Sequence, residues 1–384
     1  MGADGRRAFG VYVHVPWCAV RCGYCDFNTY LPGTQGTATP EGFGAQVAAE
    51  ARMARQALGT DADLTVDTVF FGGGTPTLLP AQDLVAALAA IDSEFGLAQG
   101  AEVTTEANPE SVDHEYLQIL RAGGFNRISF GMQSAVPQVL ATLDRVHTPG
   151  RAVQVVEWAR QAGFEQVSVD LIYGTPGETD RDWRTSLEVA LSAEPTHVSA
   201  YSLTVESGTA LARRVSRGEL AAPDGDTLAD RYAIADDVLS AAGLNWYEIS
   251  NWAVDSESRC RHNLGYWRGQ DWWGIGPGAH SHVDGFRWWN VKSPQAYAGA
   301  LNAGEWPAAG WEELSSGERE LETVMLQIRL VDGLLADSAA IGRGQLAQLA
   351  SQGLIRPDEA SRGRLVLTRS GRLLADRVVS MITI

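Results

Sequence analysis

Cysteine is scarce in this sequence, with only four among 384 residues. Four cysteines, three of them crowded together, are a poor basis for a disulfide framework, so we expect a protein of the reducing cytoplasm. No apolar run approaches the ~18 residues that suggest a membrane span, and the N-terminus lacks the apolar stretch of a secretion signal. Positive charge is also in deficit, because the net charge is −17. This acidity disfavours nucleic acid or an anionic membrane as the main partner.

The rest of the composition is that of an ordinary globular protein, and the length suits about two domains. Six β-type runs alternate with amphipathic helical patterns in the first two hundred residues. The predicted strands are Gly10–Val15, Val66–Phe71, Glu102–Glu106, Arg127–Gly131, Gln166–Leu171 and His197–Thr204. The predicted helices between them are Phe43–Leu58, Ala81–Phe95, Asp113–Ala122, Arg151–Ala162 and Arg181–Ala193. This alternation predicts an α/β fold with a parallel sheet, and six units favour a partial, TIM-like (β/α)6 barrel over a closed one.

Three cysteines, Cys18, Cys22 and Cys25, share one loop directly after the first predicted strand, in the spacing C-x3-C-x2-C. A structural zinc ion takes four protein ligands, and a cubane iron–sulfur cluster usually takes four thiolates. No fourth cysteine or histidine follows within the loop. Three thiolates therefore favour a [4Fe–4S] cluster whose fourth iron is open to a small molecule. The alternatives are an incomplete zinc site or three unpaired thiols.

Glycines or polar side chains stand at the ends of the predicted strands. Residues 72–76 read Gly-Gly-Gly-Thr-Pro after the second strand, Glu106 ends the third, Gln133 follows the fourth, Arg145 comes soon after it, and Asp170 lies in the fifth. The carboxyl ends of parallel strands meet at one edge of a sheet, where (β/α) barrels carry their chemistry. Each residue alone is explained by a turn or a helix cap. Together they suit a zwitterionic ligand that carries a ribose.

At this point the sequence resembles a known family. The segment Tyr12-x-His14-x-Pro16, the cysteine loop, the GGGTP turn and the segments EANP, GMQS and DLIYGTPGE are similar to the HemN/HemW branch of the radical S-adenosylmethionine (SAM) superfamily. That branch includes the oxygen-independent coproporphyrinogen III oxidase and a heme chaperone. The resemblance implies that a [4Fe–4S] cluster is held by Cys18, Cys22 and Cys25 and completed by exchangeable SAM. It implies a SAM site lined by Tyr12, Tyr24, Gly73, Gly74, Thr75, Glu106, Gln133, Arg145 and Asp170. We expect His14, on a strand, to be packed and hydrogen-bonded rather than a ligand.

Two departures favour the chaperone side of the branch over the oxidase side. In the oxidase the pattern is C-x3-C-x2-C-x-C, with a further cysteine two residues after the third, and here that position is Phe27. Only seventeen residues precede Cys18, whereas the oxidase has an N-terminal extension. In addition, His262-Asn-Leu-Gly-Tyr266-Trp267 is similar to an H-N-x-x-Y-W pattern that marks the chaperone relatives.

The region around this pattern is rich in tryptophan, with seven of the twelve between Trp246 and Trp289, interleaved with glycines. Flat aromatic faces flanked by small residues suit a large planar ligand such as heme. The candidate axial ligands are His262, which we place first, Cys260 next, and then His280 and His282. The nearby arginines, which could pair with porphyrin propionates, are Arg259, Arg261 and Arg268. The alternative is that the tryptophans form a satellite core and the histidines are satisfied by hydrogen bonds.

We expect three regions: a radical SAM core at 1–210, an accessory region with the H-N-x-x-Y-W pattern at 211–305 and a C-terminal domain at 306–384. Residues 306–316 are predicted as a linker. The helical patterns Gly317–Leu330, Gln345–Gln352 and Ser370–Met381, with a short strand at Arg364–Thr368, indicate a small helical domain that resembles a winged helix. Scattered arginines without a recognition helix favour a packing role over DNA binding.

We therefore expect a cytoplasmic heme chaperone that binds heme and transfers it to an acceptor protein. The cluster and SAM would support heme transfer or oligomerisation, for example as a homodimer. The first alternative is an oxygen-independent coproporphyrinogen III oxidase or another radical SAM tetrapyrrole enzyme, and whether SAM is cleaved stays open. The second alternative is a regulatory sensor of iron–sulfur status that acts through the C-terminal domain.

Overall fold

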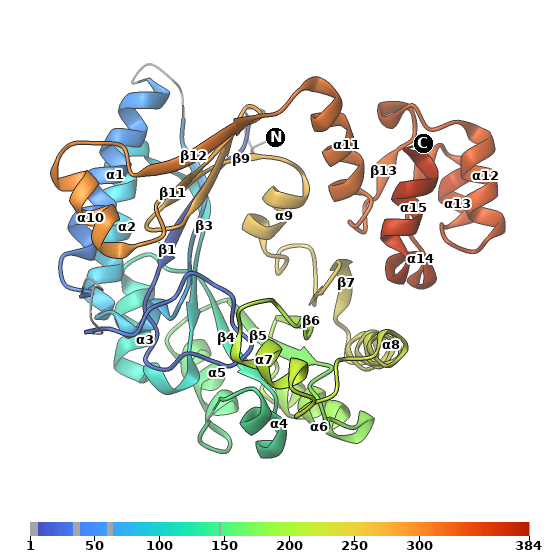
Figure 1. Ribbon diagram of the computed structural model, residues 1–384, viewed down its shortest axis with the longest axis horizontal. Helices are drawn as coiled ribbons and strands as arrows, with labels where there is room; N and C mark the ends of the chain where they lie inside the picture. Colours follow the sequence, from blue (N-terminus) through green and yellow to red (C-terminus); the bar gives the residue numbers. More distant parts are fainter. Residues whose placement is uncertain (1–6, 34–38, 60–63, 146, 384) are drawn as a thin grey trace.

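The computed structural model describes residues 7–33, 39–59, 64–145 and 147–383. Within these ranges one twelve-stranded sheet runs in the order β12-β11-β10-β9-β1-β2-β3-β4-β5-β6-β8-β7. Strands β1 to β6 pair in sequence order and all run parallel. Figure 1 shows the sheet bent around α9 (Arg261–Trp267), with the crossover helices on its outer side. The predicted α/β fold with a partial barrel is confirmed.

The six parallel strands lie where the sequence predicts them, and most extend by a few residues. They are β1 (Phe9–Val15), β2 (Val66–Gly73), β3 (Leu97–Ala107), β4 (Arg127–Gln133), β5 (Gln166–Tyr173) and β6 (His197–Ser202). The helices and 3-10 turns among them are α1 (Phe43–Leu58), η1 (Pro76–Leu78), α2 (Ala81–Phe95), η2 (Pro109–Ser111), α3 (His114–Ala122), α4 (Pro137–Thr142), α5 (Arg151–Gln161) and α6 (Asp180–Ser192).

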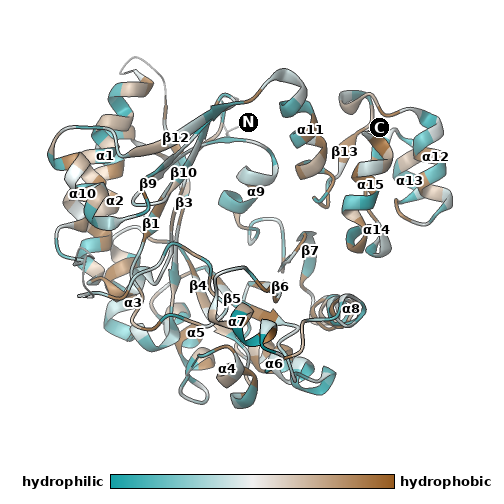
Figure 2. Ribbon diagram, viewed as in Figure 1, coloured by the Kyte–Doolittle hydropathy of each residue, from teal (hydrophilic) through white to brown (hydrophobic). Residues whose placement is uncertain are grey.

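The two faces of β1 explain how the barrel is organised. Val11, Val13 and Val15 are fully buried in the core shared with the helices. Side chains alternate across a strand, so Tyr12 and His14 point to the opposite, inner side. Helices such as α1 carry both apolar and polar residues, which Figure 2 shows in brown and teal, and α1 buries its apolar positions. The inner side of the barrel is left for polar and aromatic side chains.

The region after β6 extends the sheet at both ends. It comprises α7 (Ala210–Ser216), α8 (Gly225–Ala241), β7 (Asn245–Glu248), β8 (Asn251–Ala253), α9, β9 (Asp271–Ile275), β10 (His280–Val283), β11 (Phe286–Asn290), α10 (Pro294–Asn302) and β12 (Ala308–Glu313). Strand β9 pairs parallel with β1, and β10 to β12 continue antiparallel. Trp252 and Trp273 are buried in the main core, so part of the tryptophan cluster does serve packing. The linker prediction over 306–316 was wrong, because β12 occupies most of that segment as the edge strand of the sheet.

The C-terminal region is helical, as predicted, and has an apolar core of its own. Its elements are α11 (Ser316–Gln327), β13 (Leu334–Leu335), η3 (Asp337–Ala339), α12 (Arg343–Ser351), α13 (Pro357–Ser361), β14 (Arg364–Leu365), α14 (Arg369–Leu373) and α15 (Ala375–Ile382). The single helix predicted over Ser370–Met381 is divided at Leu374 into α14 and α15. Among the described residues, no helix combines the length and apolarity that a membrane crossing requires.

Candidate functional site

The cysteine loop follows β1 at the carboxyl edge of the sheet. Backbone hydrogen bonds close its ends, from Tyr30 N to Pro16 O at 2.7 Å and from Cys18 N to Tyr30 O at 3.0 Å. Cys18, Cys22 and Cys25 are all partly exposed, and none forms a disulfide. Burial raises the pKa of Cys18 to about 11, although Thr75 opposes the shift by hydrogen bonding. Binding to a metal must therefore displace a thiol proton.

Two neighbours donate hydrogen bonds to the sulfurs of this loop. The Thr75 hydroxyl lies 3.6 Å from Cys18 Sγ, and Arg145 Nη1 lies 3.4 Å from Cys22 Sγ. Donors to cysteine sulfur are one means by which proteins set the reduction potential of iron–sulfur clusters. Within the described residues, no three histidine, cysteine or acidic side chains converge on a single metal ion. In a cubane, by contrast, each thiolate binds a different iron, so this donor set fits a cluster better than a mononuclear site.

The glycine turn after β2 packs directly on the cysteine loop. Gly74 N donates to Val15 O and Thr75 N donates to Trp17 O, both at 2.7 Å. A Cβ on Gly74 would lie only 2.5 Å from Trp17 O, so no larger residue fits without a shift. Gly73 has a φ of +104° and would place a Cβ 2.5 Å from the His14 ring. Both glycines are therefore needed for packing, and their role in SAM binding stays a prediction.

Two carboxylates and a tyrosine from the alternate strands β1, β3 and β5 face the same inner space. Gly73 N donates to Glu106 Oε2 at 3.1 Å, and the Ser129 hydroxyl lies 2.8 Å from both oxygens of Asp170. Burial, and then the charge of Asp170, raise the pKa of Glu106 to about 8. Burial also raises the pKa of Asp170, against several hydroxyl donors. The Tyr12 ring is partly buried and completes an arrangement that favours a cationic or hydroxyl-bearing ligand.

His14 is buried and hydrogen-bonded, as expected. Its Nε2 donates to the Asn28 carbonyl at 3.0 Å, so its Nδ1 accepts from the Tyr12 hydroxyl at 3.0 Å. Asn28 itself was missed by sequence reasoning. Its side-chain amide donates to Pro277 O at 3.0 Å and to Lys292 O at 2.9 Å, and its Oδ1 accepts from the Tyr30 hydroxyl at 3.1 Å. It therefore fastens the cysteine loop to the β9–β12 extension.

Arg145 joins the end of β4 to the cysteine loop. Its Nη2 donates to Gly131 O at 2.9 Å while Nη1 reaches Cys22. Tyr24 lies close enough to Cys22 for a hydrogen bond and close enough to Arg145 to feel its charge. Gln133 ends β4 with a φ of +66°, a left-handed conformation that is uncommon outside glycine. The structure thus brings together at one edge the residues predicted for the cluster and for SAM.

The short helix α9 lies on the inner side of the sheet and is held by Glu102 of β3. The Glu102 carboxylate accepts hydrogen bonds from Arg261 N at 3.0 Å and from His262 N at 2.9 Å. The Cys260 thiol also donates to Glu102, at 3.6 Å. Buried Arg127 lies 3.9 Å from the same carboxylate. This network fixes the predicted H-N-x-x-Y-W segment against the barrel wall.

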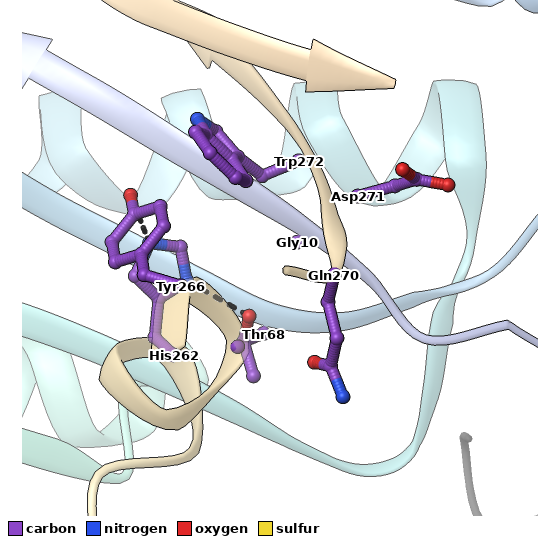
Figure 3. A pocket seen from close by; sticks show the side chains of 8 residues that line it. Gly10, Thr68, His262, Tyr266, Gln270, Asp271 and Trp272 are labelled. Atoms are coloured by element: carbon purple, nitrogen blue, oxygen red, sulfur yellow. Dashed lines mark hydrogen bonds between the residues drawn. The ribbon is translucent and has the colours of Figure 1, made fainter. Parts of the chain in front are cut away.

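The two side chains predicted as the foremost heme contacts are engaged elsewhere. His262 is buried, with Nδ1 2.8 Å from the Thr68 hydroxyl and Nε2 2.9 Å from the Tyr266 hydroxyl (Figure 3). The adjoining cavity has a volume of about 10 Å³, which is room for roughly one water molecule. Cys260 is buried as well. Binding of heme iron by either residue would require these contacts to break, and both assignments stay predictions.

A larger cavity of about 320 Å³ lies where α9 faces the end of β6 and α11. Its size is at the lower end for sites that hold small organic ligands. Buried Asn251 lines it and leaves its Oδ1 without a partner among the described residues. The lining residues are Tyr201, Glu248, Ser250, Asn251, Asn263, Tyr266, Trp267 and Leu326. Three of the four residues of the H-N-x-x-Y-W pattern therefore line this cavity.

Comparison with known proteins identifies the family. The Radical SAM superfamily pattern matches residues 12–190. The heme chaperone HemW of Mycobacterium tuberculosis is 52% identical over 374 residues, which cover 97% of this chain and 94% of that protein. The chain belongs to the HemW family. The heme chaperone HemW of Bacillus subtilis is 33% identical over 380 residues, covering 96% of this chain and 97% of that protein.

The HemW-family fold is shared with a solved enzyme structure. Coproporphyrinogen III oxidase (HemN) from Escherichia coli superposes with a TM-score of 0.79 at 23% identity, covering 98% of this chain and 90% of that one. At this identity the likeness concerns the fold alone. Membership of the radical SAM superfamily implies a [4Fe–4S] cluster and SAM as cofactors.

Proposed function

We propose that this HemW-family protein is a heme chaperone, which binds heme and transfers it to an acceptor protein. The observation that carries the proposal is the 52% identity, across nearly the full length of both chains, with the heme chaperone HemW of Mycobacterium tuberculosis. Phe27 supports it, because an exposed phenylalanine stands where the oxidase relatives have a further cysteine.

We further propose that Cys18, Cys22 and Cys25 hold the cluster at the carboxyl edge of the sheet. SAM would bind beside it, in contact with the residues named above at the ends of β1 to β5. A reduced cluster of this kind can supply an electron to the SAM sulfonium, and the cofactors carry that chemistry. This chain's own residues have supporting tasks: Arg145 holds Cys22 and the end of β4 together, and Glu106 offers a carboxyl group to a hydroxyl or an ammonium.

The remaining assignments are also proposals. We divide the chain into a radical SAM core (1–210), an accessory region (211–305) and a C-terminal domain (306–384). The separate apolar core supports the last of these over residues 324–382, whereas β12 belongs to the main sheet. We infer that the protein works in the cytoplasm, where a chaperone meets newly made heme proteins, and that it forms a homodimer. The identity of the acceptor is left to experiment.

The test compares heme binding with oxidase activity in the same cluster-loaded preparation. Anaerobic protein is titrated with heme and, separately, incubated with SAM, a reductant and coproporphyrinogen III. The proposal predicts saturable heme binding and no protoporphyrinogen above a control in which the three loop cysteines are replaced by alanine. Formation of protoporphyrinogen would instead establish the second candidate, a coproporphyrinogen III oxidase, whose fold this chain shares.

A further inference from the structure

The four side chains predicted as axial ligands of heme iron in the tryptophan-rich region differ sharply in their availability. His262 and Cys260 are buried and engaged, as described above. His282 is also buried, with Nδ1 3.1 Å from Gln270 O and Nε2 accepting from Gly285 N at 3.2 Å. His280 is exposed, and its ring makes no hydrogen bond to any residue that the structure describes. Of these three histidines, His280 is therefore the one whose ring is free to bind heme iron.

We propose that His280 is the axial ligand of heme iron, and that Lys292 pairs with a heme propionate. This proposal rests on the proposed heme-chaperone function and adds to it the place where heme sits. Imidazole nitrogen is the commonest protein ligand of heme iron in oxygen-binding and peroxidase proteins.

The ring of His280 packs against the indole of Trp289, which itself lies on the edge strand β12. In the β10–β11 pairing His280 stands opposite Trp289, and the two rings stack with centroids 5.7 Å apart and planes 26° apart. Trp289 in turn faces Gly310 of β12, where a Cβ would lie 2.6 Å from the indole ring. The absence of a side chain at Gly310 lets the indole lie across the edge strand. The stacked indole holds the exposed imidazole in one orientation, and its edge would contact a porphyrin bound through that imidazole.

Positive charge flanks the same imidazole. Burial, followed by the charges of Lys292 and Arg287, lowers the pKa of His280. Arg287 is already paired with Glu312 at 2.9 Å and Glu322 at 2.7 Å. Lys292 is exposed, has no ion pair among the described residues and is the only lysine of the chain. It is therefore the cation best able to meet a propionate.

This site adjoins the cysteine loop. The Lys292 carbonyl accepts from the Asn28 side chain at 2.9 Å and from the Tyr30 hydroxyl at 3.1 Å. Gly278, two residues before His280, packs against Asn28 so closely that a Cβ would lie 2.6 Å from its amide nitrogen. Heme bound at His280 would consequently lie beside the loop that is proposed to hold the cluster. Binding of heme at one site and of the cluster at the other can then affect each other through Asn28.

The first arm of the test uses the full-length, cluster-loaded protein, titrated anaerobically with ferric heme and followed by difference absorbance. His280→Ala should weaken binding at least tenfold and abolish the spectrum of the histidine-ligated heme, and added imidazole should restore that spectrum in His280→Gly. His114→Ala, which removes a partly exposed histidine at the start of α3, is the matched control and should behave as the unaltered protein.

The outcomes separate the two proposals. If His280→Ala keeps the unaltered spectrum and affinity while His262→Ala loses them, the assignment to His280 is overturned and the heme-chaperone function stands. If the unaltered protein binds no heme, the proposed function fails, and this inference fails with it.

The second arm concerns Lys292 and uses the absence of other lysines. Lys292→Met should weaken heme binding about three- to tenfold, whereas Lys292→Arg should retain it, because an ion pair to a carboxylate is lost only in the first. Heme dimethyl ester, which has no free propionate, should bind both variants equally. An equal affinity of Lys292→Met and the unaltered protein for heme would remove Lys292 from the site.

Discussion

Asn28 offers the most specific test of how the cluster loop is held. Replacing it by alanine removes two donated hydrogen bonds, to Pro277 O and Lys292 O, and one accepted from the Tyr30 hydroxyl. The backbone carbonyl that accepts from His14 is kept. The change therefore removes two contacts between the cysteine loop and the β9–β12 extension and one contact within the loop.

The expected cost follows from these three bonds. Each hydrogen bond contributes a net stabilisation of about 0.5–1.5 kcal/mol. Asn28 is partly exposed, so water replaces part of what is lost, and we expect a local loss of about 1–3 kcal/mol. Since ~1.4 kcal/mol is a factor of ten in an equilibrium, the open form of the loop should become about 5- to 150-fold more populated.

The assay is the rate at which the reconstituted cluster loses iron to a chelator in Asn28→Ala, together with amide hydrogen exchange of residues 16–30. Both should rise, while the midpoint of global thermal unfolding changes little. Asn302→Ala, which alters an exposed asparagine at the end of α10, is the control. Iron loss and exchange equal to those of the control would refute the proposal that Asn28 fastens the loop.

Three further changes test other parts of the site. Because the pKa of Glu106 is raised to about 8, this carboxyl group is mostly protonated at pH 7. The affinity for SAM, measured by equilibrium dialysis, should therefore rise by up to about tenfold per pH unit between about pH 6 and 7.5. Glu106→Gln should flatten this rise, and its absence in the unaltered protein would contradict the role of Glu106. Arg145→Lys should lower the cluster's reduction potential by on the order of 50 mV, because the donor to Cys22 is lost; an unchanged EPR-monitored titration would remove that role. Glu102→Gln should lower the free energy of unfolding by about 3 kcal/mol in urea, since Arg127 is then a buried charge without its carboxylate, and a loss below ~1 kcal/mol would show that the pair matters little.

The local patterns of this sequence were sufficient to predict the strands and helices of the parallel core. Helices α1 and α2 begin and end where their periodicity predicts, because an apolar stripe against a buried strand leaves few alternatives. The edge strand β12 was missed because nearly all its residues are exposed, so it lacks the alternation that marks a half-buried strand. The break at Leu374 is likewise invisible in an amphipathic run that continues on both sides of it.

The candidate site also has features that the sequence predicts and features that it does not. Residues at strand ends could be placed together from topology alone, because parallel strands end at one edge. The bond between Asn28 and Lys292 spans 264 positions of sequence, and no local signal predicts it. The difference between His262 and His280 has the same origin. His262 is covered by Thr68, which lies 194 positions away in the sequence, and by Tyr266 of its own helix, whereas His280 is left open on β10.

Transfer of heme is the measurement that tests the central claim most directly. The heme-loaded protein, with its cluster and SAM, is mixed with the apo form of a heme protein from the same cell and, separately, with an excess of an unrelated apo-globin that captures heme only after it dissociates. A chaperone should deliver heme to its acceptor faster than this spontaneous dissociation. Transfer that never exceeds the dissociation rate for any acceptor would contradict the claim.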